Sequence, residues 1–147
     1  MSELAPELKT FADSRLRSDG AAWVTTVRPD GRPTSTPIWF VWDGKYLYFT
    51  SEDAEKGKIR NISHNPNVVV ALADPYHVVS FEGKAEFINA HEHSEVIGQF
   101  SKKYASAMGV LKMDPNGRIN SRLVRITPVR WRVWQMPGGS EKVDAGA

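Results

Sequence analysis

The 147-residue sequence contains no cysteine, which excludes disulfide bonds, thiolate catalysis and cysteine-ligated metal sites. It has no apolar run near the roughly 20 residues that span a bilayer, and its N-terminus lacks the basic and apolar segments of a signal peptide. We therefore expect a cytoplasmic protein without a membrane partner. The net charge is only +2 and the basic residues are spread along the chain, which argues against a nucleic-acid partner.

Common catalytic and metal-binding signatures are also missing. His91 and His93 are two residues apart, which does not suit a metal-binding helix face, and the other two histidines add no ligand spacing. Neither a Gly-x-Ser-x-Gly elbow nor a glycine-rich nucleotide loop occurs. We therefore predict no metal site. If the chain is an enzyme, we expect a bound cofactor to supply the reactive group.

Strand and turn patterns dominate the rest of the sequence. We expect one domain over residues 1–137 and a flexible tail over 138–147. Helices are expected at 4–16, 55–64 and 92–104, and strands at 21–27, 32–42, 45–50, 67–73, 77–88, 121–127 and 130–136. We expect strand 67–73 to be buried on both faces, Gly83 to form a bulge, and Pro128 to separate the last two strands. The pattern indicates a mainly β fold, a β-barrel of about seven antiparallel strands with flanking helices.

A basic segment follows the third expected strand. Lys56, Lys58 and Arg60 surround Gly57 at a loop-to-helix junction, where unpaired N–H groups and the helix dipole attract a phosphate. Cations here oppose the dipole unless an anion lies among them, so the pattern indicates a ligand. An ordinary solvated helix face is the alternative. Thr50 ends the preceding strand, where its hydroxyl would add a phosphate contact.

Two strands offer walls for a flat ring. The strand that contains Ser35 and Phe40 has backbone groups that would bond the polar edge of a tricyclic ring, although its aromatic residues are more often core residues. The last strand, Arg130-Trp-Arg-Val-Trp134, alternates and closes the barrel. Arg132 or Trp134 on one of its faces would also reach a ligand, across a dimer interface for example.

These segments, in this order, resemble the pyridoxamine 5′-phosphate oxidase-like flavin and deazaflavin oxidoreductases with their split β-barrel. The resemblance covers about Leu8 to Gln135 and includes Asp30-Gly-Arg-Pro33, Pro37-Ile-Trp-Phe40, Leu47-Tyr-Phe-Thr50, Lys56-Gly-Lys-Ile-Arg-Asn-Ile62 and Glu82-Gly-Lys-Ala85. It implies FMN or the deazaflavin coenzyme F-420 at a homodimer interface. It also implies the following cofactor contacts: Ser35, Thr36, Pro37, Ile38, Trp39 and Phe40 at the ring and ribityl chain, Phe49, Thr50, Lys56 and Lys58 at the phosphate, and in addition Arg60 and Trp134.

The resemblance implies an oxidoreductase that transfers hydride between this cofactor and a small organic acceptor. Val78 stands where true pyridoxamine-phosphate oxidases have a glutamine, and the sequence ends soon after Gly139, before the segment that grips pyridoxal phosphate. We therefore expect a different substrate. The acidic tail of F-420 calls for extra cations, and the chain offers several, so we favour F-420 over FMN; the candidates are Lys56, Arg60, Arg118, Arg122 and Arg125.

Two further functions fit the same residues. One is a non-catalytic protein on the same fold that holds or sequesters flavin or haem, with His64 or His77 as the iron ligand. The other is an interaction module with no ligand. We expect the first to bind its cofactor without turnover, and the second to be insensitive to loss of Lys58 in every binding assay.

Overall fold

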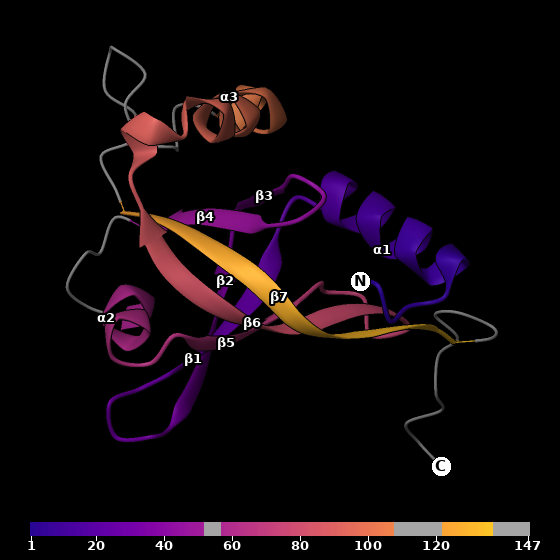
Figure 1. Cartoon of the computed structure of the whole chain (residues 1–147), viewed down its shortest axis with the longest axis horizontal. Coiled ribbons are helices and arrows are strands. Elements are labelled where there is room, and N and C mark those ends of the chain that lie inside the picture. The colour runs from indigo at the N-terminus through magenta and orange to yellow at the C-terminus, as the bar shows by residue number, and fades with distance from the viewer. Residues whose placement is uncertain (52–56, 108–121, 137–147) are drawn as a thin grey trace, which may run out of the picture.

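The computed structural model describes residues 1–51, 57–107 and 122–136. Its longer helices are α1 (Pro6–Ser18), α2 (Gly57–His64) and α3 (Ser94–Lys103). Its strands are β1 (Ala22–Val27), β2 (Pro33–Ile38), β3 (Phe40–Trp42), β4 (Leu47–Ser51), β5 (Asn67–Ala71), β6 (His77–Ile88) and β7 (Arg122–Gln135). The strands form one antiparallel sheet in the order β2-β1-β5-β6-β7-β4-β3, which curls into a half-barrel (Figure 1). The predicted mainly β fold with flanking helices is confirmed.

The two faces of the curled sheet are covered differently. Its inner face holds the main core, and α1 and α2 both contribute to it, through Ala12 and Leu16 and through Ile59 and Ile62. Helix α3 lies instead on the outer face of β3 and β4, where a smaller cluster contains Val41, Tyr48, Val96, Phe100, Tyr104 and Leu123. The outer face of β1, β5 and β6 therefore keeps apolar side chains exposed, such as Trp23 and Val69.

The predicted strand 32–42 is interrupted at Trp39, which separates β2 from β3. Tyr104, at the end of α3, holds this break. Its hydroxyl accepts a hydrogen bond from the Phe40 N–H at 3.0 Å and donates to the Gly20 carbonyl at 2.8 Å. Its ring stacks on the Trp39 indole, with centroids 4.7 Å apart and planes 2° apart. Because these contacts come from a distant helix, local strand periodicity could not predict the break.

The last two predicted strands are one strand, β7, so the expected separation at Pro128 is wrong. Gly83 pairs with Pro128 at a register shift between Glu82 and Gly83, which confirms the predicted irregularity at this glycine. A Cβ on Gly83 would lie 2.7 Å from the Ile126 methyl carbon Cγ2 and 2.9 Å from the Thr127 carbonyl oxygen. The shift lets a proline, which has no N–H to donate, remain inside a long strand.

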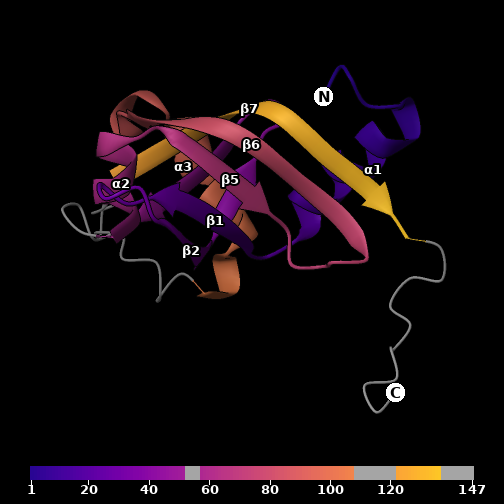
Figure 2. The same cartoon turned by 90° about the horizontal axis from the view of Figure 1, so that it is seen from below.

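The expectation that strand 67–73 is buried on both faces is also wrong. In β5 the side chains alternate: Val68 and Val70 are buried, whereas Val69 is 36% exposed. Within the described part of the chain, no helix lies over this outer face (Figure 2). In β5, the continuous apolar run therefore belongs to a strand with one face in the core and the other face exposed in the single chain.

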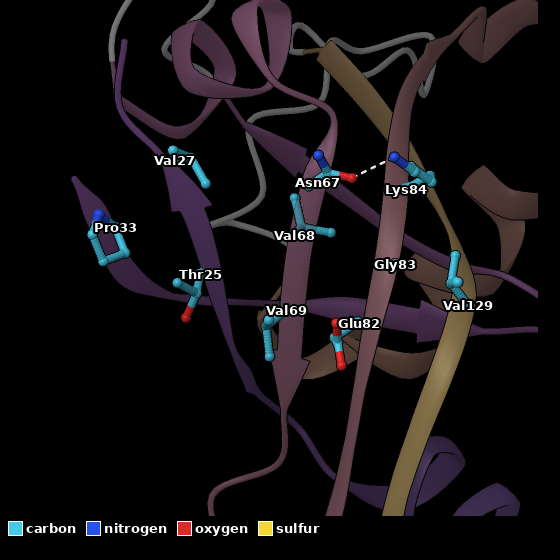
Figure 3. Close-up of a pocket in the computed structure, with 10 residues that line it drawn as sticks. All are labelled: Thr25, Val27, Pro33, Asn67, Val68, Val69, Glu82, Gly83, Lys84 and Val129. Atoms are coloured by element: carbon cyan, nitrogen blue, oxygen red, sulfur yellow. Dashed lines mark hydrogen bonds between the residues drawn. The ribbon is translucent and has the colours of Figure 1, made fainter. Parts of the chain in front are cut away.

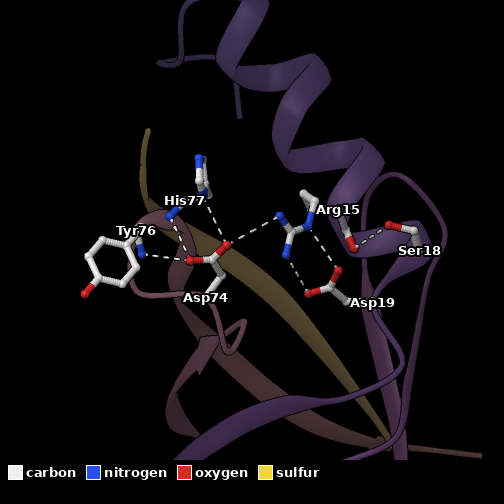
Figure 4. Close-up of polar contacts among 6 residues, drawn as sticks. All are labelled: Arg15, Ser18, Asp19, Asp74, Tyr76 and His77. Atoms are coloured by element: carbon white, nitrogen blue, oxygen red, sulfur yellow. Dashed lines mark hydrogen bonds and ion pairs between the residues drawn. The ribbon is translucent and has the colours of Figure 1, made fainter. Parts of the chain in front are cut away.

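An ion network ties the end of α1 to the turn before β6 (Figure 4). Arg15 Nε bonds Asp19 at 3.0 Å, and Arg15 Nη1 lies 3.9 Å from the Asp74 carboxylate. Asp74 also accepts from the Tyr76 and His77 N–H groups, and these bonds, the one from Tyr76 foremost, lower the pKa of its carboxyl.

None of the described helices is both long and apolar enough to cross a bilayer. The predicted tail, 138–147, lies outside the described residues.

Candidate functional site

Strand β2 carries the clearest sign of a ligand. Among the described strands it pairs with β1 alone, and its other backbone edge pairs with none of them. Along β2, Ser35 points to the outer face, where its hydroxyl lies 2.6 Å from that of Thr25. Thr36 points to the opposite face, and its hydroxyl oxygen is buried without a hydrogen-bond partner among the described residues. A buried hydroxyl is seldom left unpaired in a native protein, so Thr36 fits a position that a bound molecule completes.

Three of the predicted ring and phosphate contacts are core residues. The side chains of Ile38, Phe40 and Phe49 are at most 4% exposed and pack in the main cluster. They can meet a ligand only through their backbone groups. Pro37 is exposed on β2, and Thr50 is half-buried at the end of β4. This strand wall is therefore rigid, because its aromatic side chains are fixed by the core behind it.

Helix α2 presents its cations on two sides rather than on one. Gly57, its first residue, has φ = +56°, a conformation that favours glycine. Ile59 and Ile62 turn into the core. Since successive residues of an α-helix are about 100° apart, Lys58 and Arg60 flank this buried stripe in nearly opposite directions. Lys58 is half-buried and Arg60 is exposed; Lys56 lies outside the described residues.

A cavity of about 540 Å³ opens between the start of α2 and the β1–β2 turn. Arg60 reaches it, but Lys58 does not line it. The cavity is lined by Arg28, Pro29, Asp30, Thr34, Gly57, Arg60 and Asn61. Asn61 is fixed there because its side-chain amide donates to the buried Thr26 hydroxyl at 2.9 Å. Sequence reasoning missed Arg28 and Thr34; the turn Arg28-Pro-Asp-Gly31, which returns the chain to β2, was the available signal.

The structure does not bring Trp134 to these residues within one chain. Thr50 pairs with Leu123 near the start of β7, whereas Trp134 pairs with Val78 near its end. The eleven residue steps from Leu123 to Trp134 correspond to about 35 Å of strand. Trp134 is 47% exposed and lies on the bare outer face.

The histidines considered as haem ligands lie apart and are engaged locally. His64 ends α2, and its Nδ1 lies 2.9 Å from the Arg60 carbonyl. His77 begins β6, and its Nδ1 lies 3.1 Å from the Asp74 carboxylate. Among the described residues, no group of three or more histidine or acidic side chains could hold a metal ion.

Comparisons with known proteins extend over most of the chain. The profile of the family described as "Pyridoxamine 5'-phosphate oxidase" matches residues 7–135. A pyridoxine/pyridoxamine 5′-phosphate oxidase of Bacteroides thetaiotaomicron is 27% identical over 122 residues, which cover 79% of this chain and 54% of that protein. The chain thus spans about half the length of this curated relative.

Solved structures share the fold. An F420 reductase is 27% identical, with a TM-score of 0.64 over 82% of this chain and 94% of that one. HutZ, the haem storage protein from Vibrio cholerae, is 20% identical, with a TM-score of 0.66 over 88% of this chain and 94% of that one. At that identity, the likeness to HutZ concerns the fold alone.

Proposed function

This chain belongs to the pyridoxamine 5′-phosphate oxidase family, and on that premise we propose that it is a dimeric oxidoreductase that binds FMN or, by preference, coenzyme F-420. Its substrate is a small organic acceptor other than pyridoxamine phosphate. The single observation that carries the proposal is the Thr36 hydroxyl on β2, which is buried and has no hydrogen-bond partner among the described residues. The polar rim of a flavin or deazaflavin ring would supply the missing partner.

The residues of this wall would bind and orient the cofactor rather than react. Bound FMN or F-420 supplies the hydride chemistry. The free edge of β2 would align the ring, and the buried aromatic side chains behind it would exclude water from its rear face. The start of α2 would hold the phosphate, through its unpaired N–H groups and Lys58.

The cavity beyond Gly57 supports F-420 over FMN. FMN ends at its phosphate, whereas F-420 continues into a tail that bears carboxylates. Arg28 reaches the cavity from the β1–β2 turn, and Arg60 reaches it from α2. Both are in positions to meet such a tail. Arg28 Nη2 lies 3.4 Å from Asp30 Oδ2, so the charge of Arg28 is partly offset. Arg60 is therefore the stronger candidate to bind the tail.

A second copy of the chain would complete the site. The outer face of the sheet carries exposed apolar side chains, and a hollow of about 340 Å³ runs across β1, β5, β6 and β7 (Figure 3). Val69 and Val129 line this hollow. The exposed large apolar residues of the outer face and of the neighbouring strand ends are Trp23, Val69, Val129, Trp134 and Met136. Contact between two such faces would cover them and carry Trp134 of one copy toward the ring of the other.

Cofactor titration and turnover together test the proposal. We expect the absorption spectrum of FMN or F-420 to shift on binding, with tighter binding of F-420, and the reduced complex to pass hydride to quinones, biliverdin or nitroaromatics. Pyridoxamine 5′-phosphate serves as the substrate control. Binding without turnover of any acceptor would support the storage alternative, and absence of any spectral shift with both cofactors would refute the proposal.

Two matched variants make the test specific. Thr36→Val keeps the shape of the side chain but removes its hydroxyl, and we expect weaker cofactor binding without loss of the fold. Val69→Lys charges the bare outer face, and we expect light scattering to show monomers in place of dimers. Unchanged cofactor affinity in Thr36→Val would show that the Thr36 hydroxyl does not bind the cofactor, and would contradict the proposed ring site.

A further inference from the structure

We propose that the groove between the C-terminal ends of α1 and α3 is a second ligand site, which binds a small organic carboxylate with a flat apolar body. The groove has a volume of about 430 Å³, in the range of small-molecule pockets. It is lined by Arg17, Val41, Trp42, Gln99, Lys102 and Lys103. None of these residues lines the cavity at α2, so the two sites are separate.

Lys103 is the central feature of the groove. It is half-buried, its ammonium donates to the Phe40 carbonyl at 2.9 Å, and its Nζ lies 3.8 Å from the centroid of the Phe40 ring. Burial lowers its pKa to about 8. No described carboxylate lies within 4.0 Å of this ammonium, and Asp19, which acts on it from farther away, is paired with Arg15. A bound anion would therefore stabilise a cation that is now poorly solvated.

Arg17 is held in place on the opposite side. Its Nε donates to one oxygen of Asp13 at 2.8 Å, while the other oxygen accepts from the Trp42 indole N–H at 2.9 Å. One carboxylate thus fixes both a cation and the aromatic wall. The terminal guanidinium nitrogens of Arg17 make no hydrogen bond to another described residue, so they are available to an anion. Little ordering is needed when a ligand binds, which favours affinity.

The chemistry of the lining defines the ligand class. Arg17, Lys102 and Lys103 are cationic, Gln99 adds an amide, and no acidic residue lines the groove. The remaining wall, Val41 and Trp42, is apolar and aromatic. A carboxylate would meet the cations while a flat apolar body lies against this wall.

The helix dipole does not account for this arrangement by itself. Basic residues are favourable in the last turn of a helix, which explains the exposed Lys102. Lys103 instead turns away from the end of its own helix and reaches the carbonyl of Phe40 in β3, where it loses hydration. A lysine placed only to interact favourably with the negative end of the helix dipole would keep its ammonium in water.

Binding of benzoate to the full chain, followed by ¹H–¹⁵N NMR, tests the site. We expect saturable shifts of the Trp42 indole and Gln99 side-chain signals, and much weaker shifts with benzamide, the neutral isostere. Lys103→Met and Arg17→Ala should each weaken benzoate binding at least tenfold. Lys45→Met removes an exposed lysine of the β3–β4 turn and should have no effect.

The pH dependence provides an independent readout. Asp19 at the end of α1 acts on the Lys103 ammonium, and Arg17 and Lys102 line the same groove. Asp13 is bonded to Arg17, and Asp43 of the β3–β4 turn acts on Arg17 from farther away. We expect benzoate affinity to fall as the pH rises through about 8, where Lys103 loses its proton, and this fall to be absent in Lys103→Met.

Two outcomes would overturn the proposal: equal affinity for benzoate and benzamide, or benzoate affinity in folded Lys103→Met and Arg17→Ala within twofold of the wild type. The test is independent of the cofactor. Lys58→Ala should leave benzoate binding intact, and Lys103→Met should leave FMN and F-420 binding intact. Failure here would therefore leave the proposed function standing.

Discussion

The two basic regions of this molecule hold their cations in different ways. At α2, Lys58 and Arg60 come from one short segment, and Arg60 extends into open cavity space. At the ends of α1 and α3, Arg17 and Lys103 come from segments far apart in the sequence, and Lys103 is half-buried against Phe40. A surface cation keeps its hydration, whereas a buried one loses it and changes its pKa. The second region is therefore the more perturbed, although only the first is visible as a sequence motif.

The largest expected difference between the regions concerns Lys58. Lys58→Ala removes the cation nearest the start of α2 among the described residues, and we expect a 10- to 100-fold loss of cofactor affinity, as loss of about 1.5–3 kcal/mol from a charge-assisted hydrogen bond implies. Fluorescence titration with FMN and F-420 measures it. Lys45→Met is the control, and unchanged affinity for both cofactors would remove Lys58 from the site.

Tyr104 lies beside the second region and fixes the break between β2 and β3, because it contacts Trp39, Phe40 and Gly20 from the end of α3. Tyr104→Phe leaves the buried Phe40 N–H without its acceptor, and we expect the free energy of unfolding to fall by about 1–2 kcal/mol. Urea denaturation measures this change. Tyr46→Phe, on a turn, is the matched control, and an equal effect in both variants would contradict the role of Tyr104.

Lys103→Met should raise stability at neutral pH. The folded pKa of Lys103 is about 8, below the 10.5 of an unperturbed lysine, so the penalty of burying its charge is fully present below pH 8 and fades as the pH rises to about 10.5. Since the side chain is partly solvated, we expect a gain of only about 1 kcal/mol at pH 7. Chemical denaturation at pH 7 and pH 10 measures it. A gain that is the same at both pH values would contradict the assigned shift.

The smallest expected effect is that of Arg60→Ala. Because Arg60 is exposed, we expect a loss of only a few-fold, confined to F-420 and weakened by added salt, as for other exposed charges. Parallel titrations with FMN and F-420 at low and high salt measure it. An equal loss for both cofactors would place Arg60 at the phosphate instead of the tail.

Much of the fold could be predicted from the sequence, because its signals are local. Alternation identified the long strands, and Gly83 identified the bulge. The failures arose where distant contacts decide. The break at Trp39 depends on Tyr104, which follows α3, and Pro128 remains within β7 because the register shifts at Gly83 opposite it.

The candidate site divides in the same way. Lys58, Arg60 and the Thr36 strand follow from motif order and family resemblance. Arg28 was missed because its position in the cavity depends on how the β1–β2 turn meets α2. Opposite directions of Lys58 and Arg60 follow from helix geometry once α2 is known to begin at Gly57.

The sequence by itself determined the long strands, the turns, the absence of thiol chemistry and the basic segment at the start of α2, since each depends on residues close together in the chain. Only the tertiary structure decided which face of the sheet stays bare, that the Thr36 hydroxyl has no partner among the described residues, and that Arg17 and Lys103 share one groove. The physical reason is that burial and charge environment depend on all atoms nearby in space, whatever their separation along the chain.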